Sequence, residues 1–140
     1  MYLIDTNVIS EARKGARANP GVMAFFGQAA DRGDALFLSV ITVGELRRGV
    51  ELIRHRGDAQ QALTLESWLT GVLDQYRQFI LDFDVEAAQV WGRLRVPHAE
   101  HEIDKQIAAI ALVNDLTVVT RNTADFAGTG VRLLNPFQAI

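Results

Sequence analysis

The feature that most constrains the fold is an alternation between short apolar runs and longer segments with helical spacing. Apolar runs with the length of strands lie at residues 2–4, 36–41, 79–81, 116–120 and 131–134. Apolar residues that recur every three or four positions predict helices over residues 22–30, 42–55, 60–75, 85–94 and 103–114, and a short helix is expected directly after residue 5. Strands that alternate with helices predict an α/β fold with a mainly parallel sheet.

The composition is typical of a soluble globular domain. The chain has 140 residues, of which 49% are hydrophobic and 22% charged, and we expect residues 1–140 to form one domain. No apolar run is long enough to span a bilayer, and the first residues lack a basic region before their apolar stretch, so we expect neither a membrane segment nor a signal peptide. Cysteine is absent, which excludes disulfides and thiolate metal sites and fits a cytoplasmic location.

The charge argues against a protein that grips nucleic acid through a broad basic surface. The formal net charge is −3, with 14 basic and 17 acidic residues. Such affinity comes from many phosphate contacts, which require an excess of cations. An enzyme that contacts nucleic acid only at a local basic rim is compatible with this balance.

Four carboxylates lie at predicted strand ends or helix starts, and each has a plain structural explanation when it is considered alone. Asp5 closes the first strand and could cap the helix that follows. Glu45 could reach back to the backbone of Thr42 in a capping box. Asp104 could complement the dipole of its helix, and Asp125 could be a solvated turn residue.

Taken together, these carboxylates predict a metal site. The carboxyl ends of parallel strands meet at one edge of a sheet, where ligands bind. Like charges gathered there repel, so the fold needs protonation, basic partners or a cation. A set of oxygen ligands without cysteine suits Mg²⁺ or Mn²⁺. A cation held in this way supports phosphoryl chemistry.

Four motifs around these acids resemble those of the PIN-domain ribonucleases, specifically toxins of the VapC and FitB type. The motifs follow in the family's order and are LIDTNVIS at residues 3–10, SVITVGELRRG at 39–49, DKQIAAIA at 104–111 and TRNTADF at 120–126. Asn135, Pro136 and Phe137 also fit the FitB-like branch. Lys105 departs from the family pattern, because it is bulkier than the small residue expected after the third acid.

The resemblance implies a three-layer α/β/α sandwich that hydrolyses RNA with Mg²⁺ or Mn²⁺. It implies metal ligands at four acids, namely Asp5, Glu45, Asp104 and Asp125, and supporting roles for Thr6, Asn7, Thr120 and Asn122. It also implies a VapB-like antitoxin as partner, a homodimer, and a hetero-oligomer of toxin and antitoxin.

Basic and histidine side chains near the motifs leave two explanations open. Arg48, Arg47 and Arg121 could form a rim that contacts RNA phosphates, or could lie on a solvated surface. His98 and His101 lack the helical spacing of a zinc motif. We expect them to be ordinary loop residues, with RNA contact as the alternative.

Two other functions compete with the ribonuclease. A receiver-like phosphorylation signalling domain has similar length and an acidic Mg²⁺ pocket. Such domains resemble one another in having an acid pair after the first strand and a Lys after the last strand. Here Asp5 stands alone and no Lys follows Leu134. The second alternative is a catalytically inactive binding module, which the four intact carboxylates argue against.

Overall fold

The central sheet of the protein is parallel throughout the part of the chain that the structure describes. A computed structural model describes residues 1–138. The strand order is β3-β2-β1-β4-β5, and all four strand pairings are parallel. The strands are β1 (Tyr2–Ile4), β2 (Leu36–Ser39), β3 (Ile80–Leu81), β4 (Thr117–Val119) and β5 (Leu133–Leu134). The predicted α/β class is confirmed.

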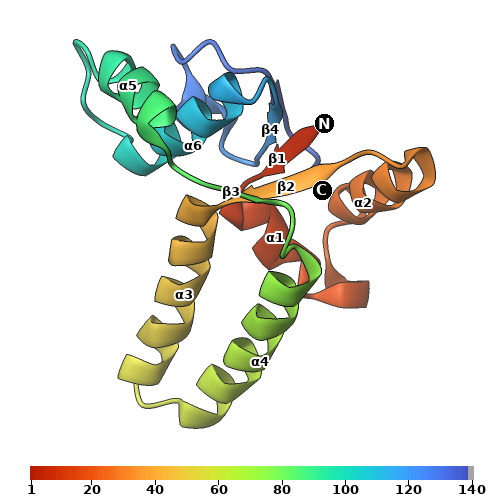
Figure 1. The fold of residues 1–140 in the computed structure, drawn as a ribbon. Helices are drawn as coiled ribbons and strands as arrows, with labels where there is room; N and C mark the ends of the chain where they lie inside the picture. Colours follow the sequence, from red (N-terminus) through yellow and green to blue (C-terminus); the bar gives the residue numbers. More distant parts are fainter. Residues whose placement is uncertain (139–140) are drawn as a thin grey trace.

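Within residues 1–138 six helices connect the strands, at the positions that the apolar spacing predicted to within about two residues. They are α1 (Thr6–Ala12), α2 (Pro20–Arg32), α3 (Val40–His55), α4 (Ala59–Gln75), α5 (Val85–Leu94) and α6 (Glu102–Val113). Helices α3 and α4 form a long hairpin that extends away from the sheet (Figure 1). Short 3-10 turns lie at η1 (Gly15–Arg17) and η2 (Thr123–Phe126). No helix within residues 1–138 has the length and hydropathy needed to cross a membrane.

The boundary between β2 and α3 differs from the prediction. The apolar run 36–41 predicted a strand to Ile41, but the strand ends at Ser39 and the helix begins at Val40. The reason is a cap: the hydroxyl of Ser39 accepts the backbone N–H of Thr42 at 3.0 Å. The capping box from Thr42 to Glu45 is therefore wrong, and the Glu45 carboxylate lies in the second turn of α3.

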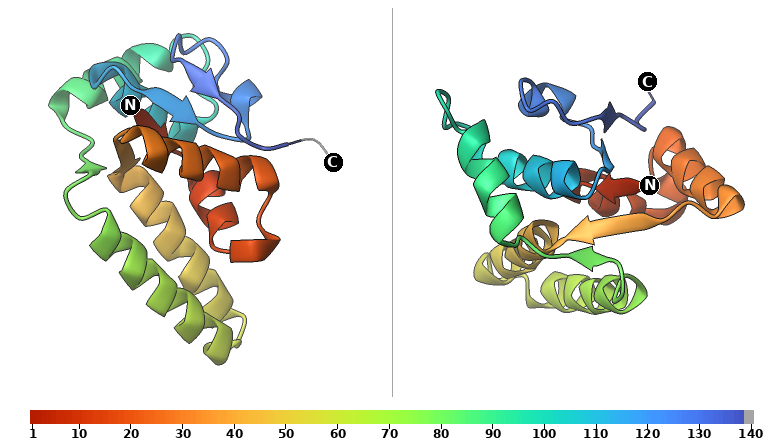
Figure 2. Two further views of the ribbon diagram at one scale, coloured as in Figure 1. Left: turned by 90° about the vertical axis from the view of Figure 1, so that its right-hand side faces the viewer. Right: turned by 45° about the horizontal axis from the view of Figure 1, so that its top comes forward.

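Side chains of each strand alternate between two cores, which makes the molecule a three-layer α/β/α sandwich. Leu3 and Val118 are fully buried in the core beneath α5 and α6. Ile4 and Val119 are fully buried in the opposite core, against α1 to α4. Figure 2 shows the sheet between these two helical layers. Helix α6 packs closely because three of its buried residues are alanine: Ala108, Ala109 and Ala111.

The sheet has a switch point between β1 and β4. From β1 the chain adds β2 and β3 on one side, and later adds β4 and β5 on the other. The connections leaving the carboxyl ends of β1 and β4 therefore diverge, and ligands of open α/β sheets bind in such a crevice. Asp5 directly follows β1 and Thr120 directly follows β4. The topology thus places two of the motifs at the same edge.

Candidate active site

Asp5 is a buried carboxylate that serves both as a helix cap and as the centre of the site. Its side chain is 4% exposed, and Oδ1 accepts the N–H of Thr6 at 2.8 Å, which caps α1. Oδ2 accepts hydrogen bonds from Thr120 Oγ1 at 2.8 Å and from Asn7 Nδ2 at 3.3 Å. Burial raises the pKa of Asp5, although these hydrogen bonds favour the ionised form.

Asn7 and Thr120 form a strut between the end of β1 and the end of β4. Asn7 Nδ2 also donates to Thr120 Oγ1 at 3.3 Å, and Asn7 Oδ1 accepts the N–H of Arg121 at 3.1 Å. The N–H of Asn122 donates to Thr120 Oγ1 at 3.1 Å. Asn7 and Thr120 therefore orient Asp5 directly, whereas Asn122 acts through its backbone.

A chain of hydroxyls links the start of α1 to the start of α3, the helix that carries Glu45. Thr6 Oγ1 donates to Thr42 Oγ1 at 3.4 Å, and Ser39 Oγ donates to the same atom at 3.3 Å. Glu45 lies three residues after Thr42, so it shares the face of α3 that is turned toward α1. Thr6 thus contributes its hydroxyl to α3 and its N–H to Asp5. Sequence reasoning missed Ser39 and assigned Thr42 a different role, since only the tertiary contact distinguishes them from ordinary strand residues.

The electrostatics of Asp104 show that the four predicted acids gather in one place. Asp104 lies half-buried in the first turn of α6. Its pKa is raised to about 6, first by burial and then by the negative charges of three carboxylates, Asp5, Asp125 and Glu45. The neighbouring His101 lowers the pKa, but less than these effects raise it. Four acids that are dispersed in the sequence thus interact across the edge of the sheet.

Asp125 is more exposed than Asp5 and Asp104. Its side chain is 39% exposed, in the 3-10 turn η2. The next residue, Phe126, is fully buried in the core beneath α6 and anchors this turn. The N–H of Asp125 donates to the carbonyl of Asn122 at 3.0 Å, which fixes the turn from its other end. An exposed carboxylate on an anchored turn can reach a cation directly or through water.

His101 contacts two of these acids, although an ordinary loop residue was expected. Its Nδ1 lies 3.8 Å from Asp104 Oδ2 and 3.9 Å from Asp125 Oδ1. The backbone of His101 is left-handed, with φ 59° and ψ 46°, directly before α6. His98 instead faces solvent, where its Nδ1 lies 3.6 Å from Glu100. The only available signal in the sequence was the three-residue spacing between His101 and Asp104.

The donor set fits a divalent cation. Ligating atoms of His101, Asp104 and Asp125 lie within 4.8 Å of one another, and the charges of Asp5 and Glu45 act on Asp104. Carboxylate oxygens with one imidazole suit hard and borderline divalent ions. The mutual repulsion that raises the pKa of Asp104 is also what a bound cation would relieve.

The two arginines that were predicted to form a basic rim on α3, Arg47 and Arg48, have different surroundings. Arg47 is paired with Glu66 of α4 at 2.7 Å and with Glu51 at 3.3 Å. Arg54 pairs with the same two acids, so the network ties the helical hairpin together. Arg48 is exposed and makes no ion pair within residues 1–138. Arg48 is consequently the freer of the two to bind a phosphate.

Arg121 lines a cavity on the surface of the protein. Its guanidinium stacks on the ring of Phe137, 4.8 Å from the centroid. The two side chains line a cavity of about 310 Å³ together with Lys14 and Arg17. Glu11 also lines this cavity and pairs with Lys14 at 3.0 Å, so Arg17 and Arg121 are the cations of the lining without that partner.

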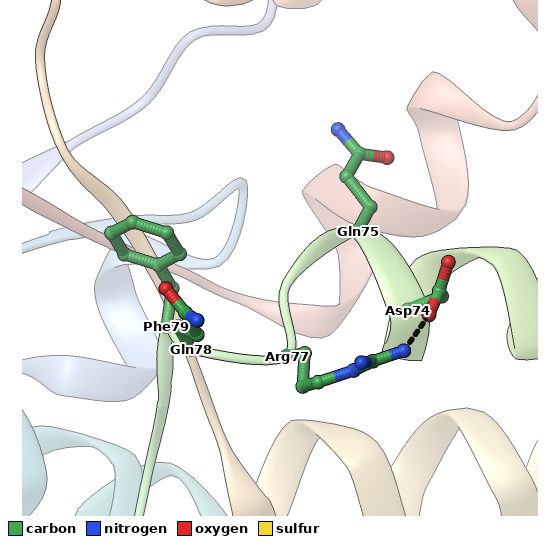
Figure 3. Close-up of a pocket in the computed structure, with 5 residues that line it drawn as sticks. All are labelled: Asp74, Gln75, Arg77, Gln78 and Phe79. Carbon is green, nitrogen blue, oxygen red and sulfur yellow. Dashed lines mark hydrogen bonds and ion pairs between the residues drawn. The ribbon is translucent and has the colours of Figure 1, made fainter.

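A further cavity lies away from the acids and carries no catalytic groups. It measures about 290 Å³ and is lined at the end of α4 by Asp74, Gln75, Arg77, Gln78 and Phe79. Figure 3 shows the Arg77 guanidinium turned toward Asp74, with Gln75 pointing elsewhere. None of the four acids of the site lines it, and we assign it no function.

Comparison with known proteins supports the family resemblance. The PIN domain family matches residues 2–130. The chain is 36% identical to Toxin FitB of Neisseria gonorrhoeae, with 99% of each chain covered. It is 32% identical to VapC ribonuclease Y4jK of Sinorhizobium fredii, again over 99% of each. The fold also matches the crystal structure of FitAcB from Neisseria gonorrhoeae, with a TM-score of 0.81, 34% identity, and coverage of 97% of this chain and 98% of that one.

Proposed function

The chain belongs to the PIN domain family, and on this premise we propose that it is a divalent-metal-dependent endoribonuclease, the toxin of a toxin–antitoxin pair. The observation that carries the proposal is the gathering of four carboxylates at one sheet edge, where burial and then the charges of Asp5, Asp125 and Glu45 raise the pKa of Asp104 to about 6. Ribonuclease chemistry is supported by the relative named VapC ribonuclease Y4jK. The family assignment also favours a nuclease over a receiver-like signalling domain. We further propose that residues 1–140 form one nuclease domain.

The four acids are proposed as ligands of Mg²⁺ or Mn²⁺, with Asp5 and Asp104 the firmest, then Glu45, then Asp125 through water. A cation held there would activate a water molecule and offset charge on the attacked phosphate. Thr120 and Asn7 both donate to Oδ2 of Asp5, which orients the carboxylate and favours its ionised form against the burial that raises its pKa. The residues of the strut thus determine the ligand geometry before any substrate arrives.

We propose RNA as the substrate, held at a local basic rim. Arg48 is exposed on the helix that carries Glu45, and Arg121 adjoins the strut around Asp5. Arg17 lines the cavity of about 310 Å³ beside Arg121, whereas Lys14 in the same lining is paired with Glu11 at 3.0 Å. Phosphate contacts of this kind position RNA without reading its sequence. A small number of such contacts is consistent with the net charge of −3.

We propose a small VapB-like antitoxin and a second copy of the chain as its partners. The resemblance to the VapC and FitB toxins implies both partners. A hollow of about 190 Å³ between α1, α3 and α4 is lined by Glu45 and Trp68. Arg13 also lines the hollow, and its apolar walls with Glu45 suit an amphipathic segment whose one cationic side chain reaches that acid.

The test is RNA cleavage by the purified full chain, before and after chelation. Wild type is expected to cleave RNA with Mg²⁺ or Mn²⁺, to stop in excess EDTA, and to recover when metal is restored. Asp5→Asn is expected to be inactive but folded, because asparagine still caps α1. Asp58→Asn is the matched control, since Asp58 caps α4 far from the site.

Activity that survives EDTA, or an active Asp5→Asn variant, would refute the metal mechanism. A wild type that binds RNA and metal but never cleaves would identify an inactive binding module instead.

A further inference from the structure

The loop before α6 holds His101 in a conformation that a side chain rarely adopts. Its backbone is left-handed, which non-glycine residues visit uncommonly and histidine more than most. Although His101 occupies the cap position of α6, its side chain makes no capping hydrogen bond. The ring is turned instead toward the carboxylates of Asp104 and Asp125, at 3.8 Å and 3.9 Å.

Contacts from α5 and α6 fix this loop. Lys105 is 7% exposed, and its ammonium donates to the carbonyl of His98. The N–H of Lys105 donates to the carbonyl of His101 at 2.9 Å. Lys105, the residue that departs from the family motif, thus bridges both ends of the segment 98–101. Its bulk is accommodated because the side chain runs under the loop rather than into the site.

The residue after His101 is tied to α5. The carbonyl of Glu102 accepts Trp91 Nε1 at 3.1 Å, and its carboxylate pairs with Arg95 at 2.7 Å. Arg95 in turn lies over the ring of Trp91, 4.6 Å from the centroid. The positions on both sides of His101 are therefore fixed, and the imidazole is held next to the acids.

We propose that His101 is a nitrogen ligand of the metal ion and makes the site prefer Mn²⁺ to Mg²⁺. The inference rests on the proposed function, because it concerns the same metal site. It assigns His101 a role in metal specificity and Lys105 the role of positioning the loop.

The distances and the donor chemistry carry this inference. Two ligands of one Mg²⁺-sized ion, each about 2.1 Å away, are at most about 4.2 Å apart. The separations of His101 from Asp104 and Asp125 fall within that limit. The full set of three donors spans up to 4.8 Å, so closing on an ion requires movements of a few tenths of an ångström. Mg²⁺ is bound almost entirely through oxygen. Mn²⁺ also takes oxygen ligands, but as a first-row transition ion it accepts an imidazole nitrogen more readily than Mg²⁺ does.

The experiment measures metal binding rather than cleavage. The full chain, with any histidine tag removed, is titrated with Mn²⁺ while free Mn²⁺ is counted by electron paramagnetic resonance, and Mg²⁺ affinity is obtained by competition. Pulsed measurements on the Mn²⁺-loaded protein then detect the coupling of imidazole ¹⁴N to the ion. The variants are His101→Gly, which accepts the left-handed backbone, and His98→Gly as the matched loop control.

Wild type is expected to bind Mn²⁺ more tightly than Mg²⁺ and to show nitrogen coupling. His101→Gly should weaken Mn²⁺ binding by about tenfold or more and lose the coupling, with an effect on Mg²⁺ below about threefold. His98→Gly should retain both properties. His101→Asn provides a second variant that tolerates the left-handed backbone and removes the imidazole if His101→Gly fails to fold.

Two results would overturn the inference, and they have different consequences. Mn²⁺ that binds without nitrogen coupling, and is lost in Asp104→Asn, would remove His101 from the site while leaving the acidic metal site intact. A wild type that binds neither ion would overturn the metal-dependent nuclease as well.

Discussion

The hydroxyl of Thr120 donates a 2.8 Å hydrogen bond to Oδ2 of Asp5, across 115 positions of sequence. The two residues follow neighbouring parallel strands, and the N–H of Asp5 itself donates to the carbonyl of Val119 at 2.9 Å. The register of β1 against β4 therefore determines where the carboxylate lies. A shift of this register would separate Asp5 from its donor and from Asp104.

Thr120→Val is expected to reduce cleavage by about tenfold, because it removes a hydrogen bond to a charged group with little change of shape. The pKa of Asp5 should rise further, so the acid side of the pH–rate profile should move to higher pH. The measurements are the pH profile of cleavage and the metal affinity.

Thr129→Val is the matched control for this substitution. Thr129 is also buried, and its hydroxyl donates to the carbonyl of Phe126 at 2.7 Å, at the end of the turn η2 and without a hydrogen bond to any of the four carboxylates. Both variants should lose about 1–2 kcal/mol of stability, but only Thr120→Val should change cleavage. Equal cleavage by the two variants would contradict a positioning role for Thr120.

Asp104 should make the metal-free protein less stable as pH rises. In the folded state its pKa is about 6, whereas the unfolded chain has the ordinary value of 3.8. Between these values the folded state binds more protons, so the free energy of unfolding decreases as pH rises through this window. The contribution is fully present below the unfolded pKa and is lost as pH rises through the folded pKa.

Urea denaturation in EDTA at pH 3.5 and at pH 7 measures this contribution. The two pH values lie below the unfolded and above the folded pKa of Asp104. Asp104→Asn should be more stable relative to wild type at pH 7 than at pH 3.5, because the amide cannot ionise. Asp115→Asn, at an exposed acid far from the cluster, should show no comparable change. If the free energy of unfolding changed with pH in the same way for wild type and Asp104→Asn, Asp104 would not destabilise the metal-free protein.

Arg48→Ala should weaken RNA binding across different sequences and flatten its salt dependence. Losing one phosphate contact changes the log–log slope by roughly 0.7 for single-stranded RNA. Arg47→Ala should leave the slope unchanged and lower thermal stability slightly, because it breaks the pairs with Glu66 and Glu51. RNA binding is measured in an Asp5→Asn background to prevent cleavage. Identical salt-dependence slopes for Arg47→Ala and Arg48→Ala would show that Arg48 lies on a solvated surface and contacts no phosphate.

An antitoxin segment should place an Arg or Lys near Glu45 and Asp104. A cationic side chain can displace metal and satisfy the repelling carboxylates at once. The proposed complex should therefore release Mn²⁺ from the toxin on binding, and its crystal structure should show the cation beside these acids. A bound segment remote from all four acids, with metal retained, would contradict this mode of inhibition.

The sequence was sufficient for the fold class, and it pointed to the four acids whose charges interact in the structure. Local apolar spacing reports which residues face a core, so five strands and six helices were located closely. The acids were found because each lies where a strand ends or a helix begins. The error at residues 40–41 arose because β-branched residues favour a strand locally, whereas the Ser39 cap and the packing of α3 favour a helix.

Only the tertiary structure decided which residues hold the acids in place and which other side chains lie beside them. The strut from Thr120 to Asp5 depends on strand order, which local patterns do not report. The position of His101 depends on a left-handed backbone held by Lys105 and α5, so its loop sequence alone looked ordinary. The distinction between Arg47 and Arg48 likewise required α4, since Glu66 is what occupies Arg47. In each case the deciding contact joins segments that no local pattern connects, because packing of the whole chain determines which of them meet.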